Sequence, residues 1–174
     1  MAKTISINRA PVLTLWATVV SHRLGFNRDE ALTLGKAVAG LNAQSKGRRL
    51  GIFKPHEDKT TKARAKKHGE GFRVEVVGRS VPAKNISEGV RAVIGNEAID
   101  PDDVQRYLES KFGDDLVAAE SAMLKLAKAY KPKDLASEAY SLYERFRPTI
   151  PEGRKGWGVK GDLDLGLIAK LAKS

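Results

Sequence analysis

The sequence contains no cysteine among its 174 residues. Disulfides, zinc fingers, iron–sulfur clusters and thiol catalysis are therefore excluded together, and the absence fits a reducing compartment. Aromatic residues make up only 6% of the chain, so aliphatic side chains have to build the core. Because 41% of the residues are hydrophobic and the length is ample for one domain, we expect a globular fold that needs no disulfide cross-links.

The chain also lacks a hydrophobic run long enough to cross a bilayer. The apolar stretch near the N-terminus is interrupted by Thr14 and Thr18 and ends at His22 and Arg23. That length is short of the roughly 20 residues that a membrane-spanning helix needs, and no small-residue cleavage site follows it. The sequence therefore predicts a soluble cytoplasmic protein with no membrane partner.

Signatures of catalysis and metal binding are missing as well. The three histidines are His22, His56 and His68, and no two of them have the helical spacing of a metal site. The adjacent pairs of aspartates are explained as helix starts. We predict no metal and no cofactor, and enzymatic activity has no support. An enzyme stays the third alternative, which would require Ser21 and His22 to meet a carboxylate in a pocket.

One glycine pattern resembles a cofactor loop. Gly156, Gly158 and Gly161 match the G-x-G-x-x-G of dinucleotide-binding proteins. Such a loop follows a buried hydrophobic strand, whereas Pro148 and Pro151 precede this one. We therefore interpret the match as fortuitous.

Positive charge is plentiful and unevenly distributed. The formal net charge is +10, and residues 46–84 carry 12 basic and 4 acidic residues, whereas residues 85–123 carry 3 basic and 9 acidic ones. Cations gathered in one stretch are typical of a protein that binds a polyanion, most often nucleic acid. A lysine-rich solubilising loop is the competing explanation.

The most basic segment lies between two stretches that resemble strands. Residues 50–53 form a short apolar patch, and residues 72–77 alternate as a half-buried strand does. We expect a long β-hairpin with an exposed, cationic tip at residues 54–71. Flexible lysines suit contacts with backbone phosphates rather than base readout, so binding would be largely blind to sequence.

A second basic segment is rich in glycine and contains a tryptophan. Two roles for Trp157 remain open, since its ring could stack on an unpaired base or could anchor the loop on the helical body. Together the two segments supply the predicted nucleic-acid-binding residues, which are Arg48, Arg49, Lys54, Lys59, Lys62, Arg64, Lys66, Lys67, Arg73, Arg154, Lys155, Trp157 and Lys160.

The rest of the chain has the periodicity and cap signals of helices. Asn27 with Glu30 is a variant of the capping box, and Asn85 with Glu88 gives a similar cap signal. Gly25 suits the end of the first helix, and Asp100 with Pro101 is a strong helix start. The first two predicted helices are joined by a short link, which allows either an ordinary α-hairpin or a helix-turn-helix. The predicted helical segments are about 10–23, one from Asn27 through Leu41, a short one at 85–93, 100–113, one from Asp114 or Asp115 to before Pro132, one from there to before Pro148, and one from about Asp164.

These elements predict a mainly α protein of about six helices with a small antiparallel β-hairpin, for which α+β is the alternative label. Residues 1–84 would form an α-hairpin with a basic arm, and residues 85–174 a helical region with a glycine-rich basic loop, together one compact unit. The predicted function is sequence-tolerant nucleic-acid binding in a regulatory or nucleoid-associated role, with DNA favoured over RNA. The alternative is a protein–protein interaction module that binds an acidic partner or self-associates into a homo-oligomer.

Overall fold

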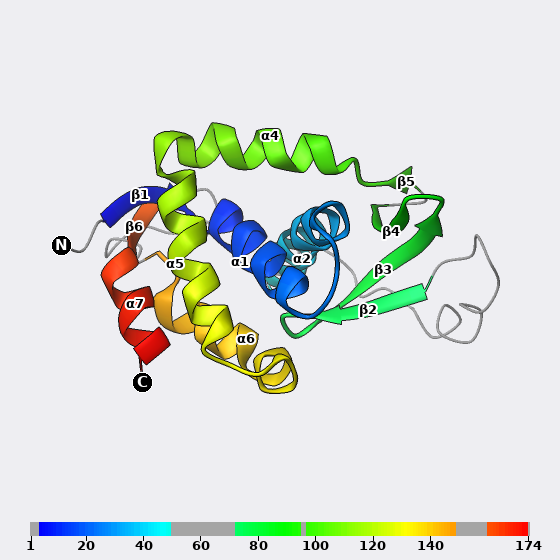
Figure 1. Ribbon diagram of the computed structural model, residues 1–174. Helices are drawn as coiled ribbons and strands as arrows, with labels where there is room; N and C mark the ends of the chain where they lie inside the picture. The colour runs from blue at the N-terminus through cyan, green and yellow to red at the C-terminus, as the bar shows by residue number, and fades with distance from the viewer. Residues whose placement is uncertain (1–3, 50–71, 95–96, 149–159, 174) are drawn as a thin grey trace.

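The computed structural model describes residues 4–49, 72–94, 97–148 and 160–173. These residues form an α+β fold in which helices surround a central helix and two antiparallel sheets lie at opposite ends (Figure 1). The described helices are α1 (Arg9–Arg23), α2 (Arg28–Arg49), α4 (Pro101–Phe112), α5 (Leu116–Lys128), α6 (Pro132–Phe146) and α7 (Leu165–Lys173), with the 3-10 turn η1 (Gly113–Asp115) between α4 and α5.

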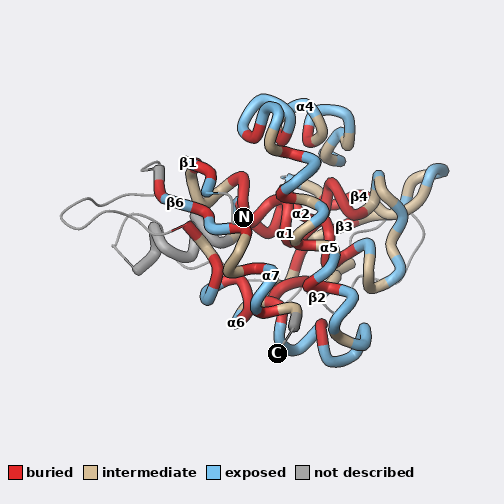
Figure 2. The backbone as a smooth tube through the Cα atoms, turned by 60° about the vertical axis from the view of Figure 1, so that its left-hand side comes forward, coloured by how far each residue is buried: buried red, intermediate tan, exposed pale blue. Residues whose placement is uncertain are grey.

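Helix α1 is the centre of the core. Every residue from Pro11 to Ser21 is buried, and Figure 2 shows the helix enclosed by other elements. A helix that is apolar on all sides has to be surrounded, and this stretch is apolar apart from Thr14, Thr18 and Ser21. The hydroxyl groups of Thr14 and Thr18 donate to the carbonyl oxygens one turn earlier, at 2.9 and 2.8 Å, so neither hydroxyl is left without a partner.

Helices α1 and α2 pack closely because a glycine lies at their contact. A Cβ atom at Gly35 would overlap Thr18 Oγ1 and would lie 2.5 Å from the carbonyl oxygen of Thr14. A side chain there would force the helices apart, so Gly35 sets how closely α2 approaches the core.

The link between these helices follows its sequence signals. Gly25 has a φ of 116°, which glycine adopts at little cost, and it ends α1 as predicted. The capping box is also confirmed: Glu30 N–H donates to Asn27 Oδ1 and Asn27 N–H donates to Glu30 Oε1, both at 2.9 Å. At the other end of α1, Asn8 is the N-cap residue, but its side chain makes no capping hydrogen bond.

The larger sheet corrects the prediction of one small hairpin. It has four antiparallel strands in the order β2-β3-β4-β5, which are β2 (Phe72–Val76), β3 (Arg79–Ile86), β4 (Gly89–Ile94) and β5 (Glu97–Ala98). The strand predicted at residues 72–77 is present, but its described neighbour is β3, reached through a turn in which Val77 and Gly78 both have positive φ. The arm predicted at residues 50–53 lies outside the described residues.

The helix predicted at residues 85–93 is wrong, because the chain turns after β3 and returns as β4. Side chains of α2 accept hydrogen bonds from the backbone of β4. Val90 N–H donates to Glu30 Oε2 at 2.8 Å, and Ala92 N–H donates to Thr33 Oγ1 at 3.1 Å. The turn residue Gly89 leaves room for the carboxylate, since a Cβ there would lie 2.5 Å from Glu30 Oε2. These side chains accept backbone hydrogen bonds from β4, as the carbonyl groups of a further strand would.

A second sheet joins the two ends of the described chain. Strand β1 (Thr4–Asn8) pairs antiparallel with β6 (Lys160–Asp164), and Asn8 lies opposite Lys160. Neither strand was predicted, and β6 occupies part of the segment expected to be a glycine-rich loop. The alternation of buried and exposed residues along β1, with Ile5 and Ile7 buried, is the pattern of a half-buried strand.

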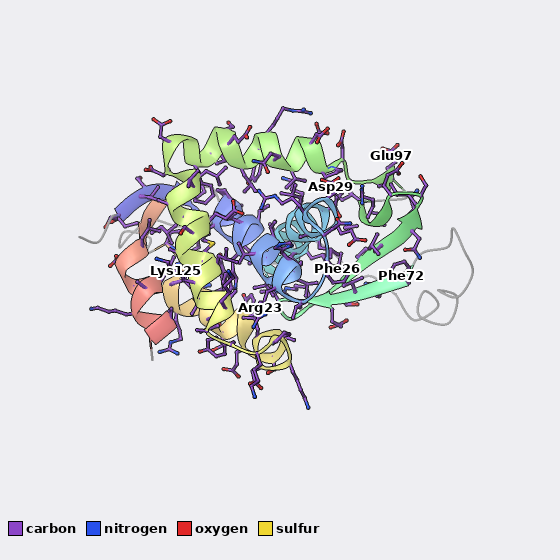
Figure 3. The ribbon with its side chains drawn as sticks, viewed as in Figure 1. Arg23, Phe26, Asp29, Phe72, Glu97 and Lys125 are labelled. Atoms are coloured by element: carbon purple, nitrogen blue, oxygen red, sulfur yellow. The ribbon has the colours of Figure 1, made fainter. Side chains whose placement is uncertain are left out.

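The helices predicted from residue 100 onward are confirmed. Asp100 caps α4, accepting a hydrogen bond from Asp102 N–H at 2.9 Å. Helix α6 is tied to the core by Trp16, whose indole N–H donates to the carbonyl oxygen of Ala139 at 2.9 Å. Arg23, labelled in Figure 3, reaches from the end of α1 to the carbonyl oxygen of Tyr130 between α5 and α6. No helix in the described ranges is long and apolar enough to cross a membrane.

Candidate nucleic-acid interface

Most of the predicted contact residues lie outside the part of the chain that the structure describes. This applies to both centres of the prediction, the cationic segment after α2 and the glycine-rich segment before β6. The residues concerned are Lys54, Lys59, Lys62, Arg64, Lys66, Lys67, Arg154, Lys155 and Trp157.

Arg48 and Arg49 are the last two residues of α2. The sequence predicted this helix only through Leu41, yet α2 continues through both arginines. Both arginines therefore stand where α2 leads into the cationic segment.

Arg73 is engaged in the sheet. It lies on β2, and its guanidinium donates across the strand pair to the carbonyl oxygen of Ser80 at 3.1 Å. On the neighbouring strand, Arg79 lies over the ring of Tyr140, with 5.6 Å between the guanidinium carbon and the ring centroid. Half-buried arginines held in this way join the sheet to its surroundings.

Lys160 lies at the positive end of α1. It begins β6 opposite Asn8, the residue that precedes the helix. The first residue of α1, Arg9, donates from Nε to the carbonyl oxygen of Pro148 at 3.0 Å. Residues 148 and 160 flank the glycine-rich segment, and these two contacts hold both of its ends beside the N-terminus of α1.

A second arginine adjoins this point. Arg147 ends α6, and its backbone N–H donates to the carbonyl oxygen of Tyr143 at 2.7 Å. Burial, followed by the nearby positive charge of Arg147, lowers the pKa of Arg9. Among the described residues, no carboxylate contributes to that shift. Two cations of like charge therefore lie near each other, and neither is ion-paired with a carboxylate in the described chain.

The same place contains a buried hydroxyl group with no hydrogen bond. Tyr143 is fully buried and its hydroxyl has no partner. Burial raises the pKa of this phenol, Arg147 and Arg9 act in the opposite direction, and the carboxylate of Glu144 has a smaller raising effect, which puts all three charges within electrostatic reach of the oxygen. We call Arg9, Tyr143 and Arg147 the arginine cluster. The sequence analysis missed it because its members are far apart in the chain.

The N-terminus of α1 adds to the positive potential. The first turn of α1 has no acidic residue and no side-chain cap. The free N–H groups of a helix N-terminus carry about half a positive charge, so an arginine is unfavourable there unless an anion is nearby. The one signal in the sequence was Arg9 itself, a cation where a helix start usually has Asp or Glu.

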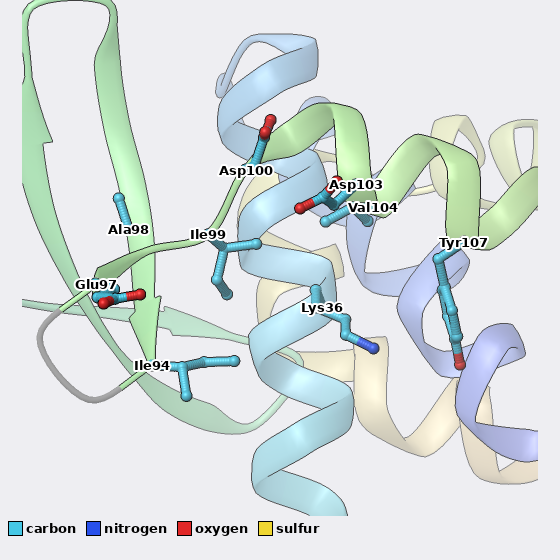
Figure 4. A pocket seen from close by; sticks show the side chains of 9 residues that line it. All are labelled: Lys36, Ile94, Glu97, Ala98, Ile99, Asp100, Asp103, Val104 and Tyr107. Carbon is cyan, nitrogen blue, oxygen red and sulfur yellow. The ribbon is translucent and has the colours of Figure 1, made fainter.

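A pocket of about 480 Å³ lies on another face, between α2, α4 and β5 (Figure 4). Inside it, Lys36 Nζ lies 4.0 Å from the centroid of the Tyr107 ring. Burial, and then the charge of Lys111, lower the pKa of Lys36, and burial raises the pKa of Tyr107. The pocket is lined by Lys36, Ile94, Glu97, Ala98, Ile99, Asp100, Asp103, Val104 and Tyr107.

The rim of this pocket is acidic and its wall is apolar. Asp100 already caps α4, and Asp103 is paired with Arg106, while Glu97 is exposed. Ile94 is 62% exposed, one of two large hydrophobic side chains so exposed in the described chain. This combination suits a cation that carries an apolar stem.

In the part of the chain that the structure describes, neither Ser21 nor His22 is hydrogen-bonded to a carboxylate. Ser21 Oγ is buried and has no hydrogen bond, and His22 Nδ1 lies 3.0 Å from the carbonyl oxygen of Phe26. Neither residue lines the pocket beside Lys36. Within the described ranges, no group of three or more His, Asp or Glu residues is placed to hold a metal ion.

No family model, curated protein or solved structure matches the chain.

Proposed function

We propose that the protein binds nucleic acid by gripping backbone phosphates, largely without regard to base sequence, in a regulatory or nucleoid-associated role and with DNA favoured over RNA. The observation that carries this proposal is the arginine cluster, where Arg9 at the start of α1 bonds to the residue after Arg147 and neither arginine is ion-paired with a described carboxylate. Like charges at close range repel, and a phosphate oxygen between them turns that repulsion into attraction.

The position of the cluster supports the proposal further. It lies at the base of the glycine-rich segment, whose two ends are held by the contacts of Arg9 with Pro148 and of Asn8 with Lys160. The predicted contacts of that segment, Arg154, Lys155 and Trp157, thus belong to the same surface in this proposal. The cationic segment after α2 provides a second group of phosphate contacts, and each phosphate neutralised releases a condensed counterion.

The proposal is tested by fluorescence anisotropy with labelled duplex DNA and single-stranded RNA at several salt concentrations. We expect affinity to fall steeply with salt, and the logarithmic slope to shrink by about 0.9 for each lost contact with duplex DNA. Variants with Arg9→Gln and Arg147→Gln, or with Lys62, Arg64, Lys66 and Lys67 replaced by glutamine, should bind more weakly with a flatter slope.

The matched control is Arg145→Gln, because Arg145 is an exposed arginine on the same helix as Tyr143. It removes the same charge while leaving the arginine cluster in place, so its slope should stay close to that of the unmodified protein. Failure of the unmodified protein to bind either nucleic acid at low salt would refute the proposal.

The pocket beside Lys36 favours a second candidate function, self-association. Its rim of Glu97, Asp100 and Asp103 and its exposed Ile94 complement a basic chain. The occupant we propose is the cationic segment 54–67 of a second copy, since no other stretch of the chain has so many cations so close together. Sedimentation without nucleic acid tests this candidate: salt and Ile94→Ser should both dissociate the complex. A monomer at low salt would rule it out.

A further inference from the structure

The arginine cluster contains more positive charge than one internal phosphate of a nucleic acid can neutralise. Arg9 and Arg147 contribute two full charges, while the half positive charge at the N-terminus of α1 is offset by the half negative charge at the C-terminus of α6, which Arg147 caps. A phosphodiester inside a strand carries a single negative charge. A phosphomonoester, such as the phosphate at a strand end, carries about −1.5 to −2 near pH 7.

The donors of the cluster also suit a group with three free oxygens. Arg9 uses Nε for the carbonyl oxygen of Pro148, and its two Nη groups make no hydrogen bond to a described residue. The guanidinium of Arg147 likewise makes none within the described ranges. Both side chains are half-buried, so they remain reachable from solvent. Guanidinium groups bind phosphate through parallel N–H···O bonds, and two of them can share three terminal oxygens.

Tyr143 supplies the inner wall of the cluster. Its hydroxyl is buried and has no partner, although buried polar groups are nearly always hydrogen-bonded. A bound phosphate oxygen at the mouth of the cluster offers this O–H an acceptor. That would explain why a hydroxyl is kept at a position where phenylalanine fills almost the same volume.

We propose that the arginine cluster binds a terminal phosphate, so that the protein prefers nucleic-acid strands with a phosphorylated end to strands ending in a hydroxyl. This inference rests on the proposed function and adds the chemical class of ligand taken by one site. The cationic segment after α2 would then hold internal phosphates of the same strand. Binding would be anchored at an end and continued along the backbone.

Two oligonucleotides of the same sequence, one with a 5′-phosphate and one with a 5′-hydroxyl, test the inference by competition against a labelled strand. We expect the phosphorylated strand to bind about tenfold more tightly, which is the effect of one or two added charge-assisted hydrogen bonds. The preference should shrink below about pH 6, where the monoester takes up its second proton.

Three variants show whether the preference comes from this cluster. Arg147→Gln should abolish it, and Tyr143→Phe should reduce it. Arg145→Gln, the exposed control, should preserve it. In a parallel measurement, inorganic phosphate should raise the melting temperature more than chloride does at equal ionic strength, and Arg147→Gln should remove that difference.

The two proposals fail in distinguishable ways. Equal affinity for the two strand ends, with normal salt-dependent binding, overturns the terminal-phosphate site and leaves nucleic-acid binding intact. Protection by inorganic phosphate without any binding of oligonucleotides overturns the nucleic-acid proposal and retains a phosphate site. A preference that survives Arg147→Gln overturns the assignment to this cluster.

Discussion

Replacing Gly35 with alanine should destabilise the protein, although alanine is the better helix former. The new Cβ would lie 2.5 Å from the carbonyl oxygen of Thr14 and would overlap Thr18 Oγ1. A backbone oxygen cannot rotate away as a side chain can, so α1 and α2 have to separate by about 1 Å to restore van der Waals contact. Because α1 is buried along most of its length, that shift disturbs the core around it.

Gly40, in the same helix, provides the matched comparison. It is exposed, and a Cβ there meets nothing within 4 Å. Gly40→Ala should therefore stabilise the protein by about 1 kcal/mol through helix propensity. The same gain applies at Gly35, so the difference in stability between the two variants isolates the steric cost, which is about 1–3 kcal/mol for overpacking.

Thermal unfolding and urea titration of the two variants test this expectation. For a chain of this size, a difference of about 1–3 kcal/mol separates the melting temperatures by roughly 2–12 °C. The urea midpoints should move in the same order, with unchanged slopes. Finding Gly35→Ala as stable as Gly40→Ala would refute the close approach of α1 and α2.

Two further predictions concern side chains with more than one role. Glu30→Ala should lower the free energy of unfolding in urea by about 2–4 kcal/mol, because it removes both the acceptor for Asn27 N–H and the acceptor for Val90 N–H. Glu30→Gln should lower it less, because one acceptor remains. Equal stabilities of the two variants would contradict the double role. Burial raises the pKa of Tyr143 above its ordinary 10.0, so its contribution to stability is complete below about pH 10 and is lost as pH rises further. Tyr143→Phe should flatten that alkaline loss, and an unchanged pH profile would count against burial of the phenol.

Local signals in the sequence predicted local structure well. The Asn27 and Glu30 capping box, the glycine that ends α1 and the start of α4 at Asp100 each depend on residues within one turn of one another. The helix predicted at residues 85–93 failed for a related reason. Short apolar runs do not distinguish strand from helix, and the cap-like Asn85 and Glu88 were given more weight than the turn at Gly89.

Features that join distant parts of the chain were not predictable from one sequence. Strands β1 and β6 pair across about 150 residues, and either segment alone is too short to be recognised as a strand. The arginine cluster was missed likewise, because nothing local to Arg9 predicts a neighbour at Arg147. A third such case is the pair of hydrogen bonds that Glu30 and Thr33 accept from β4.

The pairing of β1 with β6 has a consequence for biosynthesis. At about 5–20 residues per second, a ribosome that has made β1 needs roughly 8–30 s more to make its partner. During that interval the α1 core can assemble while β1 still presents an unpaired strand edge, to which chaperones and other nascent chains have access. A chain stalled before Lys160 would have its central helix but would lack the pairing of Asn8 with Lys160, which is one of the two contacts that hold the ends of the glycine-rich segment.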